Sequence, residues 1–426
     1  MKYSFYNVIT DNSPHNYLLY NVLTEGIIEL DEDDLSYYNH CLEEGMDLDE
    51  RFAILSEMQF LIPDDYDERA FIRFSNRKNS YSNKNLQIVI APTMDCNFSC
   101  IYCFEKHHKG AMTEELQDKT VEFVTRELKA KGYSRLHVDW FGGEPLMAWD
   151  TVKSLSRRLM DYCSENGIEY AASIISNGYL LTEEIARDMS ELKIEDIQLT
   201  LDGEKAVHDS RRMLKGGGGT YDVTLEKIAL LKDFDILVSV RVNTDRRNRE
   251  SYIRLGEIIK ELNPSAHVYP ARMECFPETD KCNCSAEMSL EEFAREIKIP
   301  HILTEDFVPE MPNKFFSCQA ERANSFAVDE QGYLYKCWNQ IGDLTAAYGN
   351  IKTYPEETNI VNLLTYMGTD ILEDEECSRC KVLPLCMGGC AYQRNFKGVK
   401  QCTVEKYCLD EIIKAIWKSN QTADEA

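Results

Sequence analysis

Three cysteines, Cys96, Cys100 and Cys103, follow one another with the spacing C-x3-C-x2-C. A structural zinc site closes a tetrahedron with four protein ligands, so zinc here would need a fourth ligand such as His107 or His108. A four-iron cluster held by three thiolates instead leaves one iron open to a small ligand. The spacing favours the iron cluster, and zinc is the alternative.

A turn that joins glycines to a carboxylate lies further along, in the stretch FGGEPL at residues 141–146. Gly142 and Gly143 permit a ligand to approach the backbone closely. The carboxylate of Glu144 can accept a hydrogen bond from an ammonium group. Taken alone, the stretch also suits an ordinary glycine turn that starts a helix.

A second cysteine pattern occupies the C-terminal part of the chain. It reads C-x13-G-x4-C around Gly332 and then C-x2-C-x5-C-x3-C, with two later cysteines. Its members are Cys318, Cys337, Cys377, Cys380, Cys386, Cys390, Cys402 and Cys408. A zinc ribbon built on residues 377–390 is the alternative to iron–sulfur clusters. Cys41 and Cys163 lie in helical patterns and are predicted to be buried structural thiols.

Composition narrows the class of partner. The chain has 426 residues, with 47 basic against 73 acidic side chains and a net charge of −26. Such a surface repels phosphate backbones and anionic lipid, so we expect neither a nucleic-acid nor a membrane partner. No segment reaches the roughly 18 apolar residues of a membrane helix, and the N-terminus lacks a signal-peptide pattern. We therefore expect a cytoplasmic protein, where the 16 cysteines indicate metal binding rather than disulfides.

Alternating strand and helix patterns must position the first cysteines and the glycine turn. Strands are predicted at 86–91, 136–141, 170–175, 197–201, 237–243 and 267–274, and helices at 114–129, 151–165, 183–192 and 224–231. Six β/α units predict an α/β fold with a parallel sheet, open or curled into a partial barrel. Ligands of such sheets bind at the C-terminal ends of the strands, where both motifs fall.

The N-terminal part reads as a separate hairpin-and-helices unit. Strands are predicted at 17–23 and 27–30, Asp31 can cap a helix, and Leu48, Phe52, Leu55 and Met58 share a helical face. The predicted domains are 1–74, a polar linker at 75–85, a core at 86–300 and a loop-rich, cysteine-bearing region at 301–426.

The cysteine trio at 96–103 resembles the signature of the radical S-adenosylmethionine (radical SAM) enzymes. The resemblance implies a partial (β/α)6 barrel and a [4Fe–4S] cluster on Cys96, Cys100 and Cys103. The open iron would bind the methionine moiety of S-adenosylmethionine, and one electron would release a 5′-deoxyadenosyl radical. Tyr102 matches the family position that lies against the adenine.

Other strand ends resemble further family motifs. FGGEPL is similar to the GGEP motif, which implies that Gly142, Gly143 and Glu144 meet the methionine amino group. Ser176 and Asn177 resemble the ribose-contacting turn. Thr200 and Arg212 are candidates for the carboxylate or ribose side.

Two segments that follow these motifs are predicted to have structural roles only. His208 and Asp209 are predicted to form a local hydrogen-bonded turn. The four glycines at 216–219 predict a flexible connector, because no P-loop lysine follows them.

The later cysteines resemble the SPASM signature, a C-terminal extension that binds auxiliary [4Fe–4S] clusters. The resemblance implies one cluster on Cys318, Cys337 and Cys390. Its fourth ligand would come from Cys275, Cys282 or Cys284, or one iron would stay open. It implies a second cluster on Cys377, Cys380, Cys386 and a late cysteine, for which the family spacing favours Cys408 over Cys402.

The two resemblances together imply a radical SAM peptide maturase. The N-terminal unit is similar to the leader-binding elements of maturases of ribosomally made peptides, and a plain structural extension is the alternative. Expected partners are a precursor peptide with leader and core and a reducing donor such as a flavodoxin or ferredoxin. The expected product is a Cys thioether.

Several other functions compete with this expectation. They are an anaerobic sulfatase-maturing enzyme that makes formylglycine from Cys or Ser, a carbon–carbon cross-linking or epimerising maturase, and a non-catalytic zinc adaptor. Sulfatase-maturing enzymes generally begin near their cysteine trio, whereas about 85 residues precede the predicted core that carries it here. The sequence identifies no general base.

Overall fold

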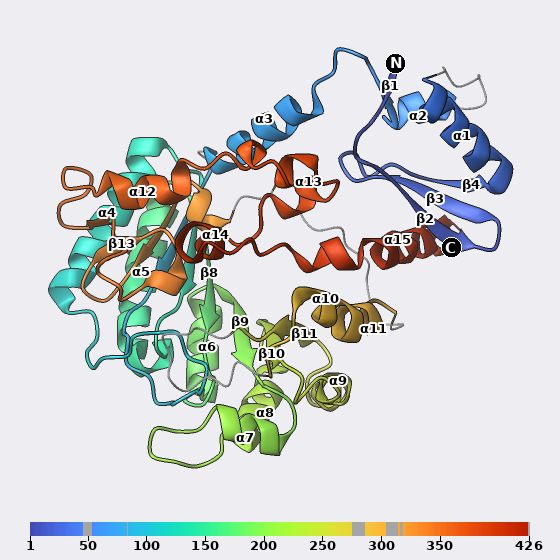
Figure 1. The fold of residues 1–426 in the computed structure, drawn as a ribbon. Coiled ribbons are helices and arrows are strands. Elements are labelled where there is room, and N and C mark those ends of the chain that lie inside the picture. Colours follow the sequence, from blue (N-terminus) through green and yellow to red (C-terminus); the bar gives the residue numbers. More distant parts are fainter. Residues whose placement is uncertain (46–52, 83, 275–285, 304–313, 316–317, 425–426) are drawn as a thin grey trace. The chain divides into compact units, whose positions relative to one another are not determined.

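The structure is a computed structural model that describes residues 1–426 except 46–52, 83, 275–285, 304–313, 316–317 and 425–426. The chain forms two compact units (Figure 1). The larger unit comprises Tyr81–Met288 and Gln319–Gly368, and the smaller unit comprises Met1–Ser80, Ser289–Cys318 and Thr369–Ala426.

The larger unit is built on a nine-stranded sheet in the order β11-β10-β9-β8-β7-β6-β12-β13-β14. Its first six strands are parallel neighbours in chain order, which confirms the predicted α/β sheet. They are β6 Asn85–Ile90, β7 Arg135–Trp140, β8 Glu169–Ile175, β9 Ile194–Thr200, β10 Leu237–Thr244 and β11 His267–Arg272. Each agrees with a predicted strand to within three residues at either end.

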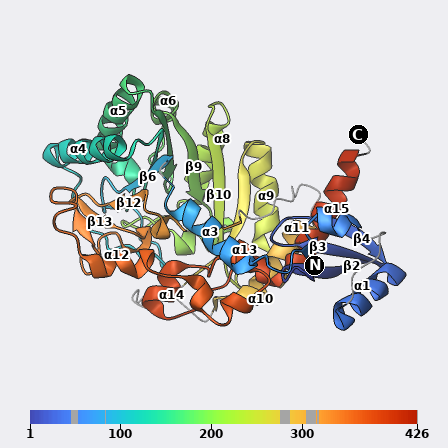
Figure 2. The same cartoon turned by 90° about the horizontal axis from the view of Figure 1, so that it is seen from above.

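Helices connect these strands and supply the apolar side chains that bury the sheet (Figure 2). They are α4 Glu114–Lys131, α5 Trp149–Glu165, α6 Glu183–Glu191, α7 Lys205–Arg211, α8 Tyr221–Leu231 and α9 Ser251–Leu262. Trp140 at the end of β7 and Phe123 on α4 are among the largest fully buried side chains of this core. The predictions omitted α7 and α9, whose patterns are short or interrupted by polar residues.

Part of the predicted cysteine-bearing region belongs to this larger unit. β12 Ser325–Val328 pairs in parallel with β6, with Phe326 opposite Ile88. β13 Tyr333–Tyr335 and β14 Gly349–Asn350 continue the sheet antiparallel, and α12 spans Ile360–Met367. Residues 319–368 therefore extend the core sheet, and the predicted single region at 301–426 is divided between the two units.

The smaller unit contains a three-stranded antiparallel sheet in the order β2-β3-β4. The strands are β2 Asn7–Ser13, β3 Asn16–Asn21 and β4 Ile27–Asp31, and β1 Lys2–Tyr3 pairs separately with β5 Leu61–Ile62. The predicted hairpin corresponds to β3 and β4. β2 was not predicted, because its sequence mixes apolar and polar residues without the turn signals of a strand.

Helix α1 Glu32–Glu44 begins at the predicted cap, where the Asp31 side chain accepts from the Asp34 backbone N–H at 2.8 Å. Helix α2 spans Ala53–Glu57 and buries Leu55. Leu48 and Phe52, which were predicted to share its face, lie outside the described residues.

The predicted polar linker at 75–85 is helical in its first part, because α3 runs over Glu68–Ser80. Ile72 is fully buried, and Arg73 forms an ion pair with Asp370 at 2.8 Å. These contacts stabilise a helix in a segment whose polar composition resembles a linker. The remaining helices of this unit are α10 Leu290–Phe293, α11 Ile299–Ile302, α13 Leu383–Cys386, α14 Ala391–Lys397 and α15 Leu409–Asp424.

No described helix is long and apolar enough to cross a bilayer.

Candidate active site

A cavity of about 380 Å³ lies at the C-terminal ends of the core strands, entirely within the larger unit. Its volume falls in the range of small-molecule and cofactor sites. All eleven predicted residues of the cluster and cofactor sites line it, namely Cys96, Cys100, Tyr102, Cys103, Gly142, Gly143, Glu144, Ser176, Asn177, Thr200 and Arg212. The structure thus brings together residues from four strand ends.

The cysteine loop follows β6 and places three thiols in this cavity. Burial raises the pKa of the Cys96 thiol to about 12, because a low-dielectric site penalises the thiolate. Burial also raises the pKa of Cys100 and of Cys103. A bound metal offsets this penalty by coordinating the thiolates, so three cysteine thiols on one cavity wall fit a metal cluster.

Gly142 and Gly143 lie so close to the backbone of another segment that no larger residue fits at either position. A Cβ atom on Gly143 would lie 2.3 Å from the backbone oxygen of Asp95, and one on Gly142 would lie 2.4 Å from that of Thr93. The backbone N–H of Gly143 donates to Thr93, and that of Glu144 donates to Asp95 at 2.8 Å. The turn therefore packs directly against the segment that leads into Cys96.

Glu144 is a buried carboxylate held by three donors. It accepts from the backbone N–H of Leu146 at 3.0 Å, from the Ser176 hydroxyl at 2.7 Å and from the Asn177 backbone N–H at 2.7 Å. Burial raises its pKa, and these hydrogen bonds oppose the rise. Ser176 and Asn177, predicted as ribose contacts, thus also fix the orientation of this carboxylate.

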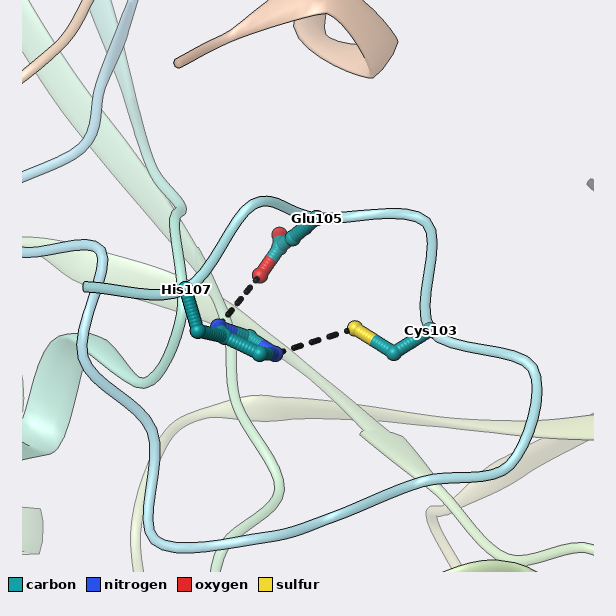
Figure 3. A group of neighbouring side chains, drawn as sticks. All are labelled: Cys103, Glu105 and His107. Carbon is teal, nitrogen blue, oxygen red and sulfur yellow. Dashed lines mark hydrogen bonds and ion pairs between the residues drawn. The ribbon is translucent and has the colours of Figure 1, made fainter. Parts of the chain in front are cut away.

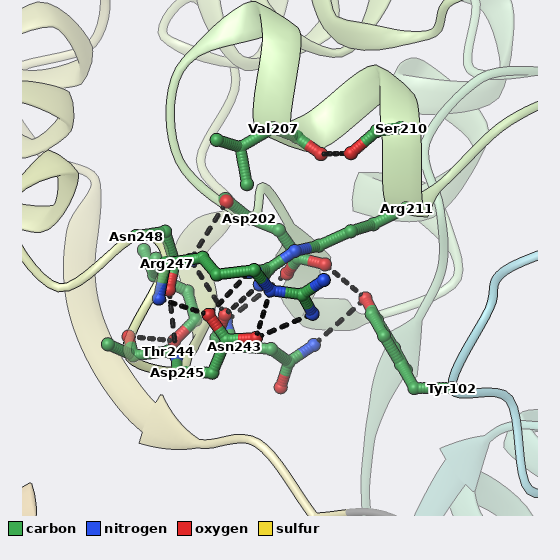
Figure 4. A network of polar contacts seen from close by, with 11 residues as sticks. Tyr102, Asp202, Val207, Ser210, Arg211, Asn243, Thr244, Asp245, Arg247 and Asn248 are labelled. Carbon is green, nitrogen blue, oxygen red and sulfur yellow. Dashed lines mark hydrogen bonds and ion pairs between the residues drawn. The ribbon is translucent and has the colours of Figure 1, made fainter. Parts of the chain in front are cut away.

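Tyr102 is anchored through its hydroxyl (Figure 4). The hydroxyl donates to Asp202 at 2.5 Å and accepts from Arg212 at 2.9 Å and from the Asn243 side chain at 3.1 Å. The guanidinium of Arg212 also lies 5.7 Å from the ring centre of Phe98. Arg212 Nε is buried and has no partner among the described residues.

The same network extends away from the cavity. Arg211, which is fully buried, pairs with Asp245 at 2.6 Å and donates to the Asn243 backbone oxygen. The Asn248 side chain donates to the backbone oxygens of Asp202 and Asn243. These bonds fix the ends of β9 and β10 that support Tyr102.

His208 and Asp209, which were predicted to form a local hydrogen-bonded turn, lie in helix α7 and make local hydrogen bonds. His208 accepts from the Asp202 backbone N–H at 3.1 Å and contacts the Thr220 hydroxyl at 3.0 Å. Asp209 accepts from the backbone N–H groups of Thr220 and Tyr221. Burial lowers the pKa of His208 to about 3, so the imidazole is neutral and structural.

Glu105 and His107 extend the cysteine loop beyond the predicted site (Figure 3). His107 Nε2 lies 3.2 Å from Cys103 Sγ, its Nδ1 lies 3.1 Å from the Met94 backbone oxygen, and the Glu105 carboxylate lies 3.9 Å from Nδ1. Burial, with the charge of Glu144, raises the pKa of Glu105 to about 8. His107 was predicted as a possible fourth ligand of zinc, and the structure places it beside Cys103.

The ligating atoms of Cys103, Glu105 and His107 lie within 4.8 Å of one another, and Cys96 and Cys100 do not belong to that group. The cavity is completed by residues that the sequence did not single out. Phe98, Phe104, Phe141, Gln198, Arg241, Asn243, Arg272, Met273, Trp338 and Asn339 line it.

In the smaller unit, Cys377, Cys380 and Cys386 pack against one apolar cluster. Cys402 lies beside them, because a Cβ on Gly389 would come 1.7 Å from the Gln401 backbone oxygen and 3.6 Å from the Cys402 Cα. Burial raises the pKa of Cys386, the Thr403 backbone lowers it, and the Cys402 thiolate raises it further.

Cys408 is placed elsewhere in the smaller unit, and its preference over Cys402 as a ligand stays a prediction. It belongs to a different apolar cluster, with Ala294, Ile302 and Ile412, and its thiol donates to the Val404 backbone oxygen at 3.4 Å. No cysteine contributes to the shift in its pKa. Helix α15 begins directly after Cys408, whose side chain is buried.

The other predicted auxiliary ligands are distributed between the units. Cys337 is buried in the larger unit, and Cys318 and Cys390 belong to the smaller unit. Cys275, Cys282 and Cys284 lie outside the described residues. This ligand set stays a prediction.

Comparison with known families identifies the class. Residues 90–254 match the Radical SAM superfamily. Together with the parallel sheet and the cysteine loop after its first core strand, this match shows that the chain contains a radical SAM domain. Its cofactors are S-adenosylmethionine and a [4Fe–4S] cluster, and the cysteines for auxiliary clusters are present.

Two similar proteins share low sequence identity with this chain but match most of its length. The chain is 21% identical to the radical SAM cyclopropyl synthase TigE of Paramaledivibacter caminithermalis, over 89% of this chain and 86% of TigE. It is 25% identical to a cysteine-type anaerobic sulfatase-maturating enzyme of Clostridium novyi, over 72% of this chain and 88% of the relative.

Solved structures share the fold. Native anSMEcpe with bound AdoMet superposes with a TM-score of 0.61 and 20% identity, over 80% of this chain and 99% of its own. Streptococcus suis SuiB superposes with a TM-score of 0.54 and 15% identity, over 92% of this chain and 95% of its own.

The held carboxylate of Glu144 gives a test of the site. In Glu144→Gln, an N–H₂ group replaces one of the two carboxylate oxygens. At least one of the three partners of Glu144, all of which are donors, then faces another donor. The unpaired buried group costs about 1–3 kcal/mol, and we expect S-adenosylmethionine to bind roughly tenfold more weakly. Equilibrium dialysis with reconstituted enzyme measures this.

The exposed Glu191→Gln at the end of α6 is the matched control. Equal affinity in both variants would contradict a role for Glu144 in the cofactor site.

Proposed function

We propose that this enzyme is a peptide maturase that removes two hydrogens from a precursor peptide and joins a cysteine sulfur to carbon. When bound, the cluster and S-adenosylmethionine supply a radical that abstracts a hydrogen atom from an unactivated C–H bond. In the overall change a C–H bond and an S–H bond break and a C–S bond forms. The radical carries away one hydrogen atom and so one of the two electrons. The thiol proton is released, and the second electron leaves through the auxiliary clusters, which are its proposed route, while a flavodoxin or ferredoxin is the proposed donor of the electron that generates the radical.

The observation that carries this proposal is the extent of the likeness to SuiB. That likeness covers 92% of this chain, whereas anSMEcpe is matched over 99% of its own length and only 80% of this chain. SuiB has been solved bound to its precursor peptide SuiA. The additional length here supports a precursor-peptide maturase over a sulfatase-maturing enzyme.

The residues of the cavity support this chemistry. We propose that Cys96, Cys100 and Cys103 hold the radical SAM cluster and that the predicted cofactor residues from Tyr102 to Arg212 hold S-adenosylmethionine. Phe141 and Trp338 stack at 5.7 Å on the cavity wall. Such aromatic walls exclude water and restrain a bound peptide side chain.

A carbon–carbon bond is the second candidate outcome. It is favoured by the likeness to TigE, named as a cyclopropyl synthase, over 89% of this chain. Such a product also requires the loss of two hydrogens, but it leaves cysteine thiols free.

Product analysis separates these outcomes. Short cysteine-containing peptides encoded next to this enzyme's gene are co-expressed with it and examined by mass spectrometry. We expect the loss of two hydrogens together with the loss of one thiol that reacts with iodoacetamide, because the sulfur becomes a thioether. A Cys96→Ala variant is the inactive control.

Each other outcome would replace the thioether assignment. Loss of two hydrogens with all thiols reactive indicates a carbon–carbon bond, an aldehyde in place of a cysteine indicates formylglycine formation, and unchanged mass with altered chirality indicates epimerisation.

The N-terminal sheet is the proposed site for the leader of the precursor peptide. The Asn21 N–H donates to the Gly26 oxygen, so the next hydrogen-bonded pair is Leu19 and Ile28. The backbone groups of Glu29 therefore face away from β3. This outer edge of β4 has no partner strand among the described residues, and an extended peptide can add there as a strand.

The opposite edge of the sheet is less suited. Val22 N–H donates to the Tyr6 oxygen, which by the same alternation turns the backbone groups of Ile9 away from β3. On that edge, Lys381 Nζ already donates to the Asn7 backbone oxygen at 2.6 Å. We therefore propose β4, and not β2, as the leader-binding edge.

A proline pair tests this choice. Glu29→Pro removes an outward N–H that a bound strand would need, and an edge strand tolerates proline at such a position. We expect it to weaken binding of a fluorescein-labelled leader, measured by anisotropy, at least tenfold. Ile9→Pro makes the same change on β2 and is expected to bind normally. Equal weakening, or none in Glu29→Pro, would refute leader binding at β4.

We also propose that Cys377, Cys380, Cys386 and Cys402 hold an auxiliary cluster. In Cys402→Ala we expect reconstituted enzyme to lose up to about four irons per chain, while Cys408→Ala keeps its iron. Iron and acid-labile sulfide analysis measures both. Iron loss confined to Cys408→Ala would restore the family spacing as the better guide.

A further inference from the structure

Two buried tyrosines in the smaller unit share an unusual feature. Tyr6 and Tyr20 are each 1% exposed, and neither hydroxyl has a hydrogen-bond partner among the described residues. A buried hydroxyl without a partner is costly and needs an explanation. Both rings belong to the apolar cluster against which Cys377, Cys380 and Cys386 pack.

The surroundings of the two hydroxyls differ. Burial raises the pKa of Tyr6, the charge of Glu68 raises it further, Arg69 lowers it, and the Cys380 thiolate also raises it. Burial raises the pKa of Tyr20 as well, but its charged neighbour is Glu25 and no cysteine contributes. Tyr6 also lines one pocket together with Ser378 and Arg379, the two residues between Cys377 and Cys380, and Tyr20 is not among the residues of that pocket. Tyr6 is therefore the tyrosine that lies beside the cysteine segment.

Hydrogen bonds fix Tyr6 relative to that site. Lys381, next to Cys380, donates to the backbone oxygen of Asn7, next to Tyr6, at 2.6 Å. Arg69 donates to the Ser378 backbone oxygen at 2.9 Å. The cysteine segment is thus tied on both sides of Cys380 to elements that hold the Tyr6 ring.

We propose that the Tyr6 hydroxyl donates a hydrogen bond to a sulfur of the auxiliary cluster held by Cys377, Cys380 and Cys386. The inference rests on the auxiliary cluster of the proposed function. Hydrogen bonds to the sulfurs stabilise the more negative, reduced form of an iron–sulfur cluster and so raise its reduction potential. Tyr6 then tunes the potential of the cluster through this hydrogen bond. Because Tyr6 directly precedes β2, the N-terminal sheet would support the iron–sulfur site in addition to binding the leader peptide.

The test compares two conservative substitutions in the full chain. The background is the triple variant Cys96→Ala, Cys100→Ala, Cys103→Ala, which leaves only auxiliary clusters after reconstitution. Tyr6→Phe and Tyr20→Phe each remove one buried hydroxyl and keep the ring. Redox titration followed by electron paramagnetic resonance measures the potential of each cluster.

We expect Tyr6→Phe to lower the equilibrium constant for reducing one auxiliary cluster by about tenfold, the size of a hydrogen bond to a charged group. Tyr20→Phe should leave every potential unchanged. Loss of auxiliary iron in Tyr6→Phe, with iron retained in Tyr20→Phe, would support the same contact.

Two results would overturn the proposal. They are unchanged potentials in Tyr6→Phe with the iron retained, and equal shifts in both variants. Absence of auxiliary iron in the triple variant with both tyrosines intact is a different result. It would refute the auxiliary cluster of the proposed function itself.

Discussion

The close approach of two backbone turns, at the ends of β6 and β7, is the constraint on which the site depends. A side chain on Gly143 would place its Cβ 2.3 Å from the Asp95 oxygen, so only glycine allows the contact. Cys96 follows Asp95 and Glu144 follows Gly143. The relation between the first cysteine and the buried carboxylate is therefore fixed by main-chain packing, which side-chain rotation cannot loosen.

The other end of the cysteine loop is fixed by hydrogen bonds to charged and polar side chains. Tyr102 is bonded at its hydroxyl to Asp202, Arg212 and Asn243, and these residues come from two strand ends and the segment after α7. A buried hydrogen-bond network orders its members strongly, because breaking one bond leaves a buried polar group unpaired. The loop between the two anchors then holds its thiols in one cavity before any metal binds.

Local patterns in the sequence were sufficient for the core strands and for the residues of the cavity. The six parallel strands follow from apolar runs bounded by turns, and the motifs fall at their ends. Pairing between distant segments could not be read in this way. The parallel pairing of β12 with β6 joins residues more than 230 positions apart, and no local pattern in Ser325–Val328 specifies its partner. The helical start of the predicted linker depends in the same way on the remote Asp370.

The choice between Cys402 and Cys408 shows the same limit in chemical terms. Burial raises the pKa of Cys408 to about 12, the value also reached by Cys96, and that of Cys163 to about 11. A raised thiol pKa is thus common to cavity-lining and core cysteines, so it does not identify a metal ligand. Ligands are distinguished by other thiols close enough to share a metal. Gly389 approaches the Cys402 backbone and donates a hydrogen bond to the Cys386 backbone oxygen at 2.9 Å, which places Cys402 on the side of Cys386, whereas Cys408 is surrounded by aliphatic side chains.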